Sequence, residues 1–280
     1  MSGNSNLLIA YPYLGAKNTV IGEIRQYFPR HKHFVDVFFG SGAVTLNKKS
    51  SPIETANDIN GEVINFFRML REQPQNLIRA LEYTPVSREE FNLSWDMSNA
   101  TDLERARRFF VRARQSFRSL GAQAQNKGWN MAKTKAETKH AETVTRWINS
   151  VEMLPLVVNR LKQVQFENRH FRDLIPAIDF NEAFFYLDPT YPDEARKSKN
   201  DYRFEMTKAE HYELAEIVHN IEGKAMISGY ECPLMKKLYG DWNLVKLKTR
   251  ANNMRRDPVQ ECIWMNYIPP THSQKILFVI

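Results

Sequence analysis

The sequence predicts an α/β protein in which helices flank a parallel sheet and a helical domain is inserted. Short apolar runs typical of buried parallel strands alternate with amphipathic segments near both ends of the chain. Between them, residues 66–154 have helical character almost throughout. We therefore expect two domains, one from residues 1–65 and 155–280 that contains the sheet, and a helical one from residues 66–154.

The composition is that of an ordinary globular chain. Of 280 residues, 42% are apolar and 25% are charged, which excludes wholesale disorder. No run approaches the roughly 18 apolar residues that span a bilayer, and residues 1–10 lack the features of a signal peptide. Two cysteines, Cys232 and Cys262, are too few for a disulfide framework or a zinc cage. These features predict a cytoplasmic protein with no membrane contact.

The expected strands are short apolar runs that end in polar or glycine-containing turns. The first of them, residues 33–39, ends at Gly40. The others are residues 53–57, 164–166, 183–187, 225–228, 244–247 and 262–265.

The expected helices show apolar residues at helical spacing. One covers residues 62–81 with a break at Pro74, and another covers residues 207–221. A further helix is expected after Ser87, which forms a capping-box pattern with Glu90.

Basic residues are concentrated in one window, residues 105–139. It contains ten Lys and Arg residues and one acid, Glu137, so its charge is 10 − 1 = +9 against +7 for the whole chain. A cluster without counter-charges favours a polyanion partner over a solvated helix face. We therefore expect the window to bind nucleic acid.

A polar segment, residues 121–135, lies inside this window. It carries two glycines and no helical period, which predicts a loop or hairpin. Its amides suit adenine edges in the major groove, although a solvated connection remains the alternative. The residues expected to contact DNA are Arg112, Arg114, Arg118, Gln123, Asn126, Lys127 and Lys133.

A glycine-rich turn follows the first expected strand. Gly40 and Gly42 lie where ligands bind in an open parallel sheet, beyond the carboxyl end of a strand. Thr45 stands where a full dinucleotide fingerprint has its third glycine, so a tight strand–helix turn remains possible. Asp58 follows the second expected strand, where a carboxylate can accept hydrogen bonds from ribose hydroxyls, cap a helix, or do both.

A third motif carries the chemistry: Asp188-Pro189-Thr190-Tyr191, directly after an apolar strand. The Asp188 carboxylate and the Pro189 carbonyl could each accept one hydrogen of an exocyclic amine. The nitrogen then becomes more tetrahedral, and its lone pair can attack an electrophilic methyl group. Tyr191 would stack on the base, whereas the alternative is a plain strand-ending turn.

Taken in order, these motifs resemble those of the Dam-type DNA adenine methyltransferases, the alpha group of amino-methylating enzymes. Phe38, Gly40 and Gly42 match the family's FxGxG loop, and residues 188–191 match DPPY with Thr190 in place of the second proline. The other matching elements are residues 11–17 (YPYLGAK, like PYxGGK with Ala16 for the second glycine), 57–60 (NDIN, like NDxN), Phe171 and 261–267 (ECIWMNY, like the closing strand).

The resemblance implies a Rossmann-like methyltransferase sheet, S-adenosylmethionine as cofactor and no metal. It also implies methyl transfer to the exocyclic amine of adenine in double-stranded DNA, with the target base flipped out. The catalytic residues it implies are Asp188, Pro189 and Tyr191. The cofactor-binding residues it implies are Tyr11, Tyr13, Lys17, Asp36, Phe38, Phe39, Gly40, Gly42, Asp58, Phe171 and Asp188.

Two alternatives stay open at the level of sequence. One is a DNA-binding protein that has lost catalysis, with Thr190 as the lesion. The other is an enzyme that methylates the exocyclic amine of cytosine, which obeys the same chemistry. The sequence allows a cognate restriction endonuclease as a partner, and it gives neither the target site nor the oligomeric state.

Overall fold

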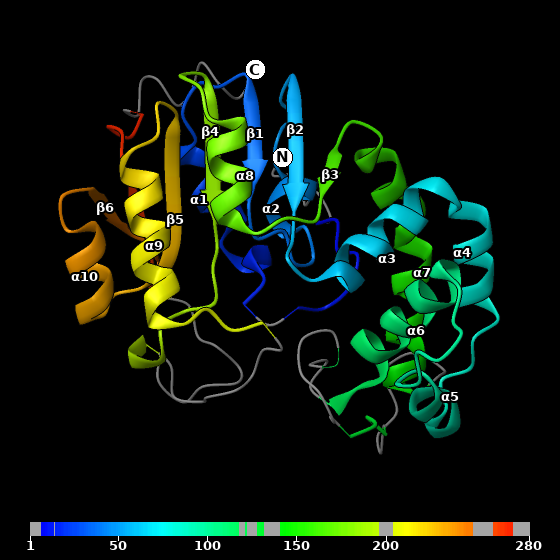
Figure 1. Ribbon diagram of the computed structural model, residues 1–280. Helices are drawn as coiled ribbons and strands as arrows, with labels where there is room; N and C mark the ends of the chain where they lie inside the picture. Colours follow the sequence, from blue (N-terminus) through cyan, green and yellow to red (C-terminus); the bar gives the residue numbers. More distant parts are fainter. Residues whose placement is uncertain are drawn as a thin grey trace, which may run out of the picture.

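The computed structural model describes residues 7–13, 15–117, 121, 128–131, 141–195, 204–248 and 260–270. Within these residues a seven-stranded sheet with the order β3-β2-β1-β4-β5-β7-β6 lies beside a group of helices (Figure 1). The strands are β1 (His33–Asp36), β2 (Ile53–Asn57), β3 (Gln165–Glu167), β4 (Ala183–Leu187), β5 (Lys224–Tyr230), β6 (Asn243–Lys246) and β7 (Glu261–Met265).

Every expected strand is present, but the sheet is mixed rather than parallel. Strands β1 to β5 pair in parallel, whereas β7 runs antiparallel to both β5 and β6. An antiparallel pair needs no crossover helix between its strands. Strands β6 and β7, which are consecutive in the sequence, can therefore also be neighbours in the sheet. Strand β1 ends at Asp36 rather than at residue 39, because the chain turns there toward Gly40 and Gly42, both at positive φ.

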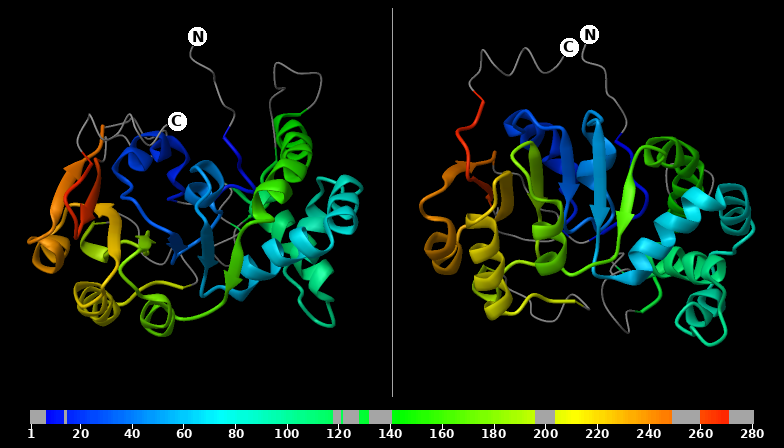
Figure 2. Two further views of the ribbon diagram at one scale, coloured as in Figure 1. Left: turned by 90° about the horizontal axis from the view of Figure 1, so that it is seen from above. Right: turned by 45° about the horizontal axis from the view of Figure 1, so that its top comes forward.

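Helices cover both faces of the sheet (Figure 2). Side chains of β4 alternate between the faces, as the pleat of a strand requires. Phe185 and Leu187 pack with α8 (Phe171–Ile178), α9 (Lys208–His219) and α10 (Pro233–Tyr239). Phe184 and Tyr186 pack on the other face with α1 (Ile21–Ile24) and α2 (Ala43–Asn47). The doubly covered α/β architecture predicted from the apolar runs is therefore confirmed.

In the described part of the chain between β2 and β3, five helices form a group to one side of the sheet (Figure 1). Their shared core includes Phe66, Phe110 and Trp147. The expected limits, 66 and 154, fall inside the first and last of these continuous helices, so the helical segment is wider, residues 61–161. The helices of this group are α3 (Gly61–Glu72), α4 (Pro74–Glu82), α5 (Arg88–Leu93), α6 (Asp102–Gln115) and α7 (Glu142–Leu161).

The expected helix signals are also confirmed. Pro74 is the first residue of α4, which separates it from α3. The Ser87 side chain accepts from the Glu90 amide at the start of α5, and Thr207 with Glu210 forms a full capping box on α9. Among the described residues, none of the helices combines the length and apolarity that a bilayer crossing requires.

Strands β1 and β4 lie side by side at the point where the strand order of the sheet reverses. From β1 the chain continues through β2 to β3 on one side, and β4 continues to β5 on the other. The Val37 amide donates to the Tyr186 carbonyl at 3.1 Å, so the carboxyl ends of the two strands stay together. Ligands of open α/β sheets bind at such a switch point.

Candidate active site

The loop after β1 requires glycine at two positions. Gly40 has φ +51° and Gly42 has φ +72°, a region that side chains rarely adopt. A Cβ on Gly40 would lie 2.9 Å from Cε1 of Tyr13, and one on Gly42 would lie 2.6 Å from Cζ of Phe39. The FxGxG pattern is therefore explained by backbone conformation and close packing.

Asp58, just beyond β2, holds this loop. Its Oδ2 accepts from the Gly40 amide and its Oδ1 from the Asn60 amide, both at 2.8 Å. Burial raises the pKa of Asp58 to about 6. Asn60, not Asp58, is the N-cap of α3, so the helix-cap alternative for Asp58 is wrong.

Asp36 ends β1 and is 2% exposed. Its Oδ2 accepts from the Thr45 hydroxyl at 2.6 Å, which gives a role to the threonine that replaces a third glycine. Burial, together with the nearby carboxylate of Asp188, raises the pKa of Asp36 to about 7. Asp36 is therefore a buried group at the end of β1, close enough to Asp188 for their charges to interact.

The N-terminal segment supports the glycine loop from the protein interior. The Tyr11 hydroxyl donates to the Gly40 carbonyl at 2.8 Å, and its fully buried ring packs on Phe66 and Phe109. Phe39 is likewise buried. Because neither side chain reaches the surface, we interpret both as supports for the loop rather than as cofactor contacts.

Two other aromatic residues of the expected cofactor set lie together. The rings of Phe38 and Phe171 are 6.1 Å apart, and Phe171 is the first residue of α8. Asn57 ties this region to β1, because its side chain donates to the carbonyls of Val37 and Arg169.

Asp188, immediately after β4, is held by two donors. The Lys17 ammonium lies 2.6 Å from Oδ1 and 2.7 Å from Oδ2, and the Ser228 hydroxyl donates to Oδ1 at 2.8 Å. The sequence predicted Lys17 among the cofactor contacts, whereas its ammonium binds the Asp188 carboxylate in the structure. Ser228 lies on β5 and was not predicted, since a serine inside an apolar strand carries no distinctive signal.

Tyr191 stands beside this carboxylate. Its hydroxyl donates to Oε1 of Glu261 and lies 3.4 Å from Oδ1 of Asp188. Burial and the charge of Glu261 hold the pKa of Tyr191 well above its usual value. Glu261, at the start of β7, also lies 3.6 Å from the Lys17 ammonium. The sequence showed Glu261 only as part of the closing strand and gave it no role.

Thr190, the departure from DPPY, has its own structural function. Its Oγ1 accepts from the Met206 amide at 2.8 Å. The hydroxyl thus ties the loop after β4 to the segment that leads into α9, a restraint that a proline ring cannot provide. Pro189 is buried between Asp188 and this tether.

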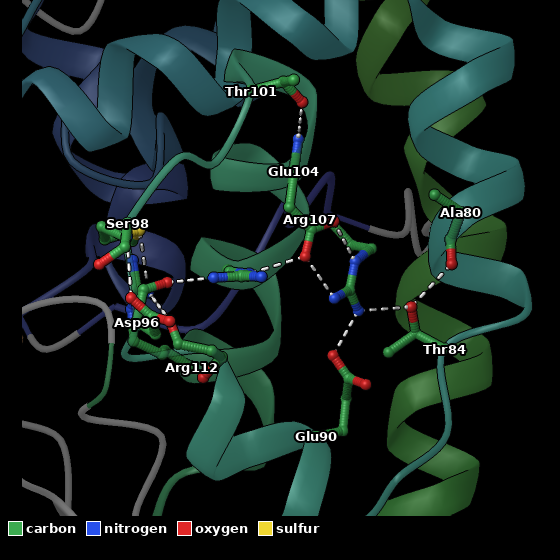
Figure 3. A network of polar contacts seen from close by, with 12 residues as sticks. Ala80, Thr84, Glu90, Asp96, Ser98, Thr101, Glu104, Arg107 and Arg112 are labelled. Atoms are coloured by element: carbon green, nitrogen blue, oxygen red, sulfur yellow. Dashed lines mark hydrogen bonds and ion pairs between the residues drawn. The ribbon is translucent and has the colours of Figure 1, made fainter.

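Four arginines of α6, namely Arg105, Arg107, Arg108 and Arg112, lie near carboxylates of the helical segment, and Figure 3 shows the contacts of Arg107. Arg107 binds both oxygens of Glu104 at 2.7 Å and also contacts Glu90 at 2.6 Å. Arg105 pairs with Glu62, and Arg108 with Glu104. The absence of counter-charges inside residues 105–139 was therefore misleading, because the carboxylates come from outside that window.

Arg112 is wrongly assigned as a phosphate contact. Its side chain is 7% exposed, donates to the Ser94 carbonyl and lies 3.8 Å from Glu62. Arg114 is partly buried over the Phe110 ring, and burial lowers its pKa to about 10. The remaining residues expected to contact DNA, Arg118, Gln123, Asn126, Lys127 and Lys133, lie outside the described residues.

The base of the polar segment forms a hairpin. The Phe117 amide donates to the Gly128 carbonyl at 2.6 Å, and the Asn130 amide donates to the Gln115 carbonyl at 2.8 Å. An antiparallel bridge joins Ser116 to Trp129. Of the two forms expected for this segment, the hairpin is confirmed at its base.

The class that the fold defines is that of Rossmann-like α/β proteins with a ligand site at the carboxyl ends of the parallel strands. The glycine loop and Asp58 lie at the switch point of the sheet. Residues 188–191, which include the acid, the proline and the aromatic, lie at the same edge.

Comparison with known proteins identifies the family. The family model for the D12 class N6 adenine-specific DNA methyltransferase matches residues 13–253, so the chain belongs to that family and is an adenine-specific DNA methyltransferase. The Type II methyltransferase M1.LlaDCHI of Lactococcus lactis subsp. cremoris is 23% identical over 91% of this chain and 94% of its own length.

Two further relatives cover less of their own length or of this chain. A DNA N-6-adenine-methyltransferase of Escherichia phage P1 is 24% identical over 82% of this chain, which spans 31% of that protein. A DNA adenine methylase of Vibrio cholerae is 33% identical over 66 residues, 24% of each chain.

Proposed function

We propose that the protein transfers the methyl group of S-adenosylmethionine to the exocyclic amine of adenine in double-stranded DNA, with the target base flipped into the pocket at Asp188. Membership of the family establishes that the substrate is adenine in DNA. The observation that supports the rest is the Asp188 carboxylate, fixed by Lys17 and Ser228 beside the Tyr191 ring at the switch point of the sheet.

The residues around the glycine loop fit S-adenosylmethionine. A side chain at Gly40 would collide with the Tyr13 ring, so the tight loop after β1 depends on glycine there. Asp58 keeps acceptor capacity for ribose hydroxyls after binding two amides, because each carboxylate oxygen has two lone pairs. Asp36 and Asp58 give this edge a negative potential when ionised, which suits a cationic ligand. When bound, the cofactor supplies a methyl group activated by a positively charged sulfur.

The residues after β4 prepare the amine. The carboxylate of Asp188 accepts one amino hydrogen and the Pro189 carbonyl accepts the other, which draws the nitrogen toward tetrahedral geometry. Lys17 and Ser228 hold the carboxylate in place before the base arrives, so little reorganisation is needed at the moment of reaction.

Base flipping follows from where these acceptors lie. Only 19% of the Asp188 side chain is exposed, and the residue lies at the edge of the sheet rather than on a protruding element. Its carboxylate therefore cannot reach an amine inside a stacked duplex. Extruding a base costs a few kcal/mol, which stacking on Tyr191 and phosphate contacts can offset. Arg114 and the basic residues outside the described part of the chain remain the candidates for those contacts.

A cognate restriction endonuclease is a further part of the proposal. It is supported by the Lactococcus lactis relative, which is named a Type II methyltransferase and matches this chain over most of both lengths.

The experiment is methyl transfer from methyl-labelled S-adenosylmethionine to duplex DNA of mixed sequence. We expect acid-stable label in the DNA with the wild-type protein, and much less on the same DNA already methylated to completion by this protein. Label that stays with the cofactor at all enzyme concentrations would contradict the proposed function.

A further inference from the structure

Glu261 is a buried acid that the chemistry described so far does not use. It opens β7, and 13% of its side chain is exposed. It pairs with Tyr230 in the antiparallel register of β5 and β7. Its carboxylate accepts from the Tyr191 hydroxyl and lies 3.6 Å from the Lys17 ammonium. A buried carboxylate is costly unless it is paired, and both of its partners belong to the Asp188 pocket.

The Tyr191 hydroxyl has two acceptors within reach. It donates to Oε1 of Glu261, while Oδ1 of Asp188 lies 3.4 Å away, at the long limit of a hydrogen bond. Without Glu261, the nearest remaining acceptor is therefore Asp188. Oδ1 already accepts from Lys17 and Ser228, so a third donor there would displace one of them or compete with the amine of the base.

We propose that Glu261 is a positioning residue for methyl transfer, because it holds the Tyr191 hydroxyl away from Asp188 and so leaves that carboxylate to accept a hydrogen from the target amine. The proposal rests on the proposed function, since it uses Asp188 as the acceptor. It adds a residue from the opposite end of the sequence to the site.

The surroundings of the Tyr191 ring agree with this role. The Lys17 ammonium lies 5.1 Å from the ring centroid, and the Tyr230 ring packs edge-on at 4.7 Å. The hydrogen bond from the Tyr191 hydroxyl to Glu261 is a third restraint on the ring. The ring is therefore oriented before a base stacks on it, which reduces the ordering cost of binding.

Single substitutions give the first test. Glu261→Ala is expected to lower kcat about tenfold, the loss of one charge-assisted hydrogen bond, with KM for cofactor and for DNA changed less than about threefold. Glu261→Gln retains an acceptor oxygen and is expected to keep most of the activity. Glu231→Ala removes a carboxylate that pairs with Lys246 at the surface and serves as the matched control. Thermal unfolding of each variant establishes that it is folded.

A double substitution separates positioning from general structural support. In the wild-type background, Tyr191→Phe is expected to lower kcat, because the ring loses its tie to Glu261. In the Glu261→Ala background, the same change is expected to raise kcat about threefold, because the competing hydroxyl is gone. If Tyr191→Phe lowers kcat in both backgrounds, Glu261 does not protect Asp188 and the proposal is overturned.

A crystal structure of the Glu261→Ala variant tests the geometry independently of activity. We expect the Tyr191 hydroxyl oxygen to lie within about 3 Å of Asp188 Oδ1. A hydroxyl that stays in place or turns to solvent would overturn the proposal. If the wild-type protein transfers no methyl group to DNA, the proposed function fails, and this structure still decides whether Glu261 separates the two groups.

Discussion

Charged side chains have different kinds of partner at the sheet edge and in the helical segment. At the edge, burial raises the pKa values of Asp36 and Asp58 to about 7 and about 6, and their hydrogen bonds come from neutral donors. In the helical segment, guanidinium groups such as that of Arg107 bind two carboxylates at once. Asp188 at the same edge is paired with Lys17, so the contrast with the helical segment applies to Asp36 and Asp58. A count of charges along the sequence does not distinguish the two regions.

The largest effect is expected at the reactive edge. Asp188→Ala removes the acceptor for the target amine and is expected to slow methyl transfer about a thousandfold. DNA affinity is expected to stay within about threefold, because the scaffold is untouched. Single-turnover rates and DNA binding by fluorescence anisotropy measure the two quantities. A rate within about tenfold of wild type, or about 1.4 kcal/mol, would remove Asp188 from the mechanism.

The next effect concerns the scaffold. Arg107→Ala leaves Glu90 and Glu104 without their shared partner and is expected to lower the free energy of unfolding by about 3 kcal/mol. The matched control is Arg146→Ala, which breaks an exposed pair with Glu142 and is expected to cost less than about 0.5 kcal/mol. Urea unfolding compares them. Equal losses would mean that burial of the arginine network contributes nothing.

The sequence predicted much of this site, for a physical reason. Gly40, Asp58 and Asp188 each follow an apolar strand, and the carboxyl ends of neighbouring parallel strands meet at one edge. Glu261 could not be placed in the same way, because β7 enters the sheet antiparallel and brings its first residue, not its last, to that edge. One partner of Arg107, Glu90, was equally hidden because it lies on another helix, whereas Glu104 lies three residues away on the same helix.

A third prediction uses pH to sharpen the contrast. The folded-state pKa of Asp36, about 7, lies above its ordinary value of 3.8, so protonation favours the folded protein. That stability is fully present below about pH 4 and is lost as the pH rises toward 7. Asp36→Asn keeps an acceptor for Thr45 and is expected to stabilise the free protein by about 2 kcal/mol at pH 8.

The same substitution should have little effect on stability near pH 4. Thermal unfolding of wild type and Asp36→Asn across this pH range measures the difference. A stability difference that does not change with pH would mean that Asp36 is not the titrating group.

The smallest effect concerns the cofactor. Asp58→Ala is expected to weaken S-adenosylmethionine binding about tenfold, because ribose hydroxyls lose an acceptor and the Gly40 amide loses its anchor. Asp179→Ala is the matched control, since Asp179 also accepts from two backbone amides, those of Glu222 and Gly223, away from the loop. Calorimetry that finds the same cofactor affinity in both variants would assign Asp58 a purely structural role.

Methyl transfer to the exocyclic amine of adenine is proposed to take place at Asp188. Mass analysis of nucleosides from duplex DNA treated with wild-type protein and labelled S-adenosylmethionine tests this most directly, with Asp188→Ala as the blank. We expect the label to appear in N6-methyladenine with the wild type and to be nearly absent with the variant. Label in N4-methylcytosine, or equal labelling of adenine by both proteins, would contradict it.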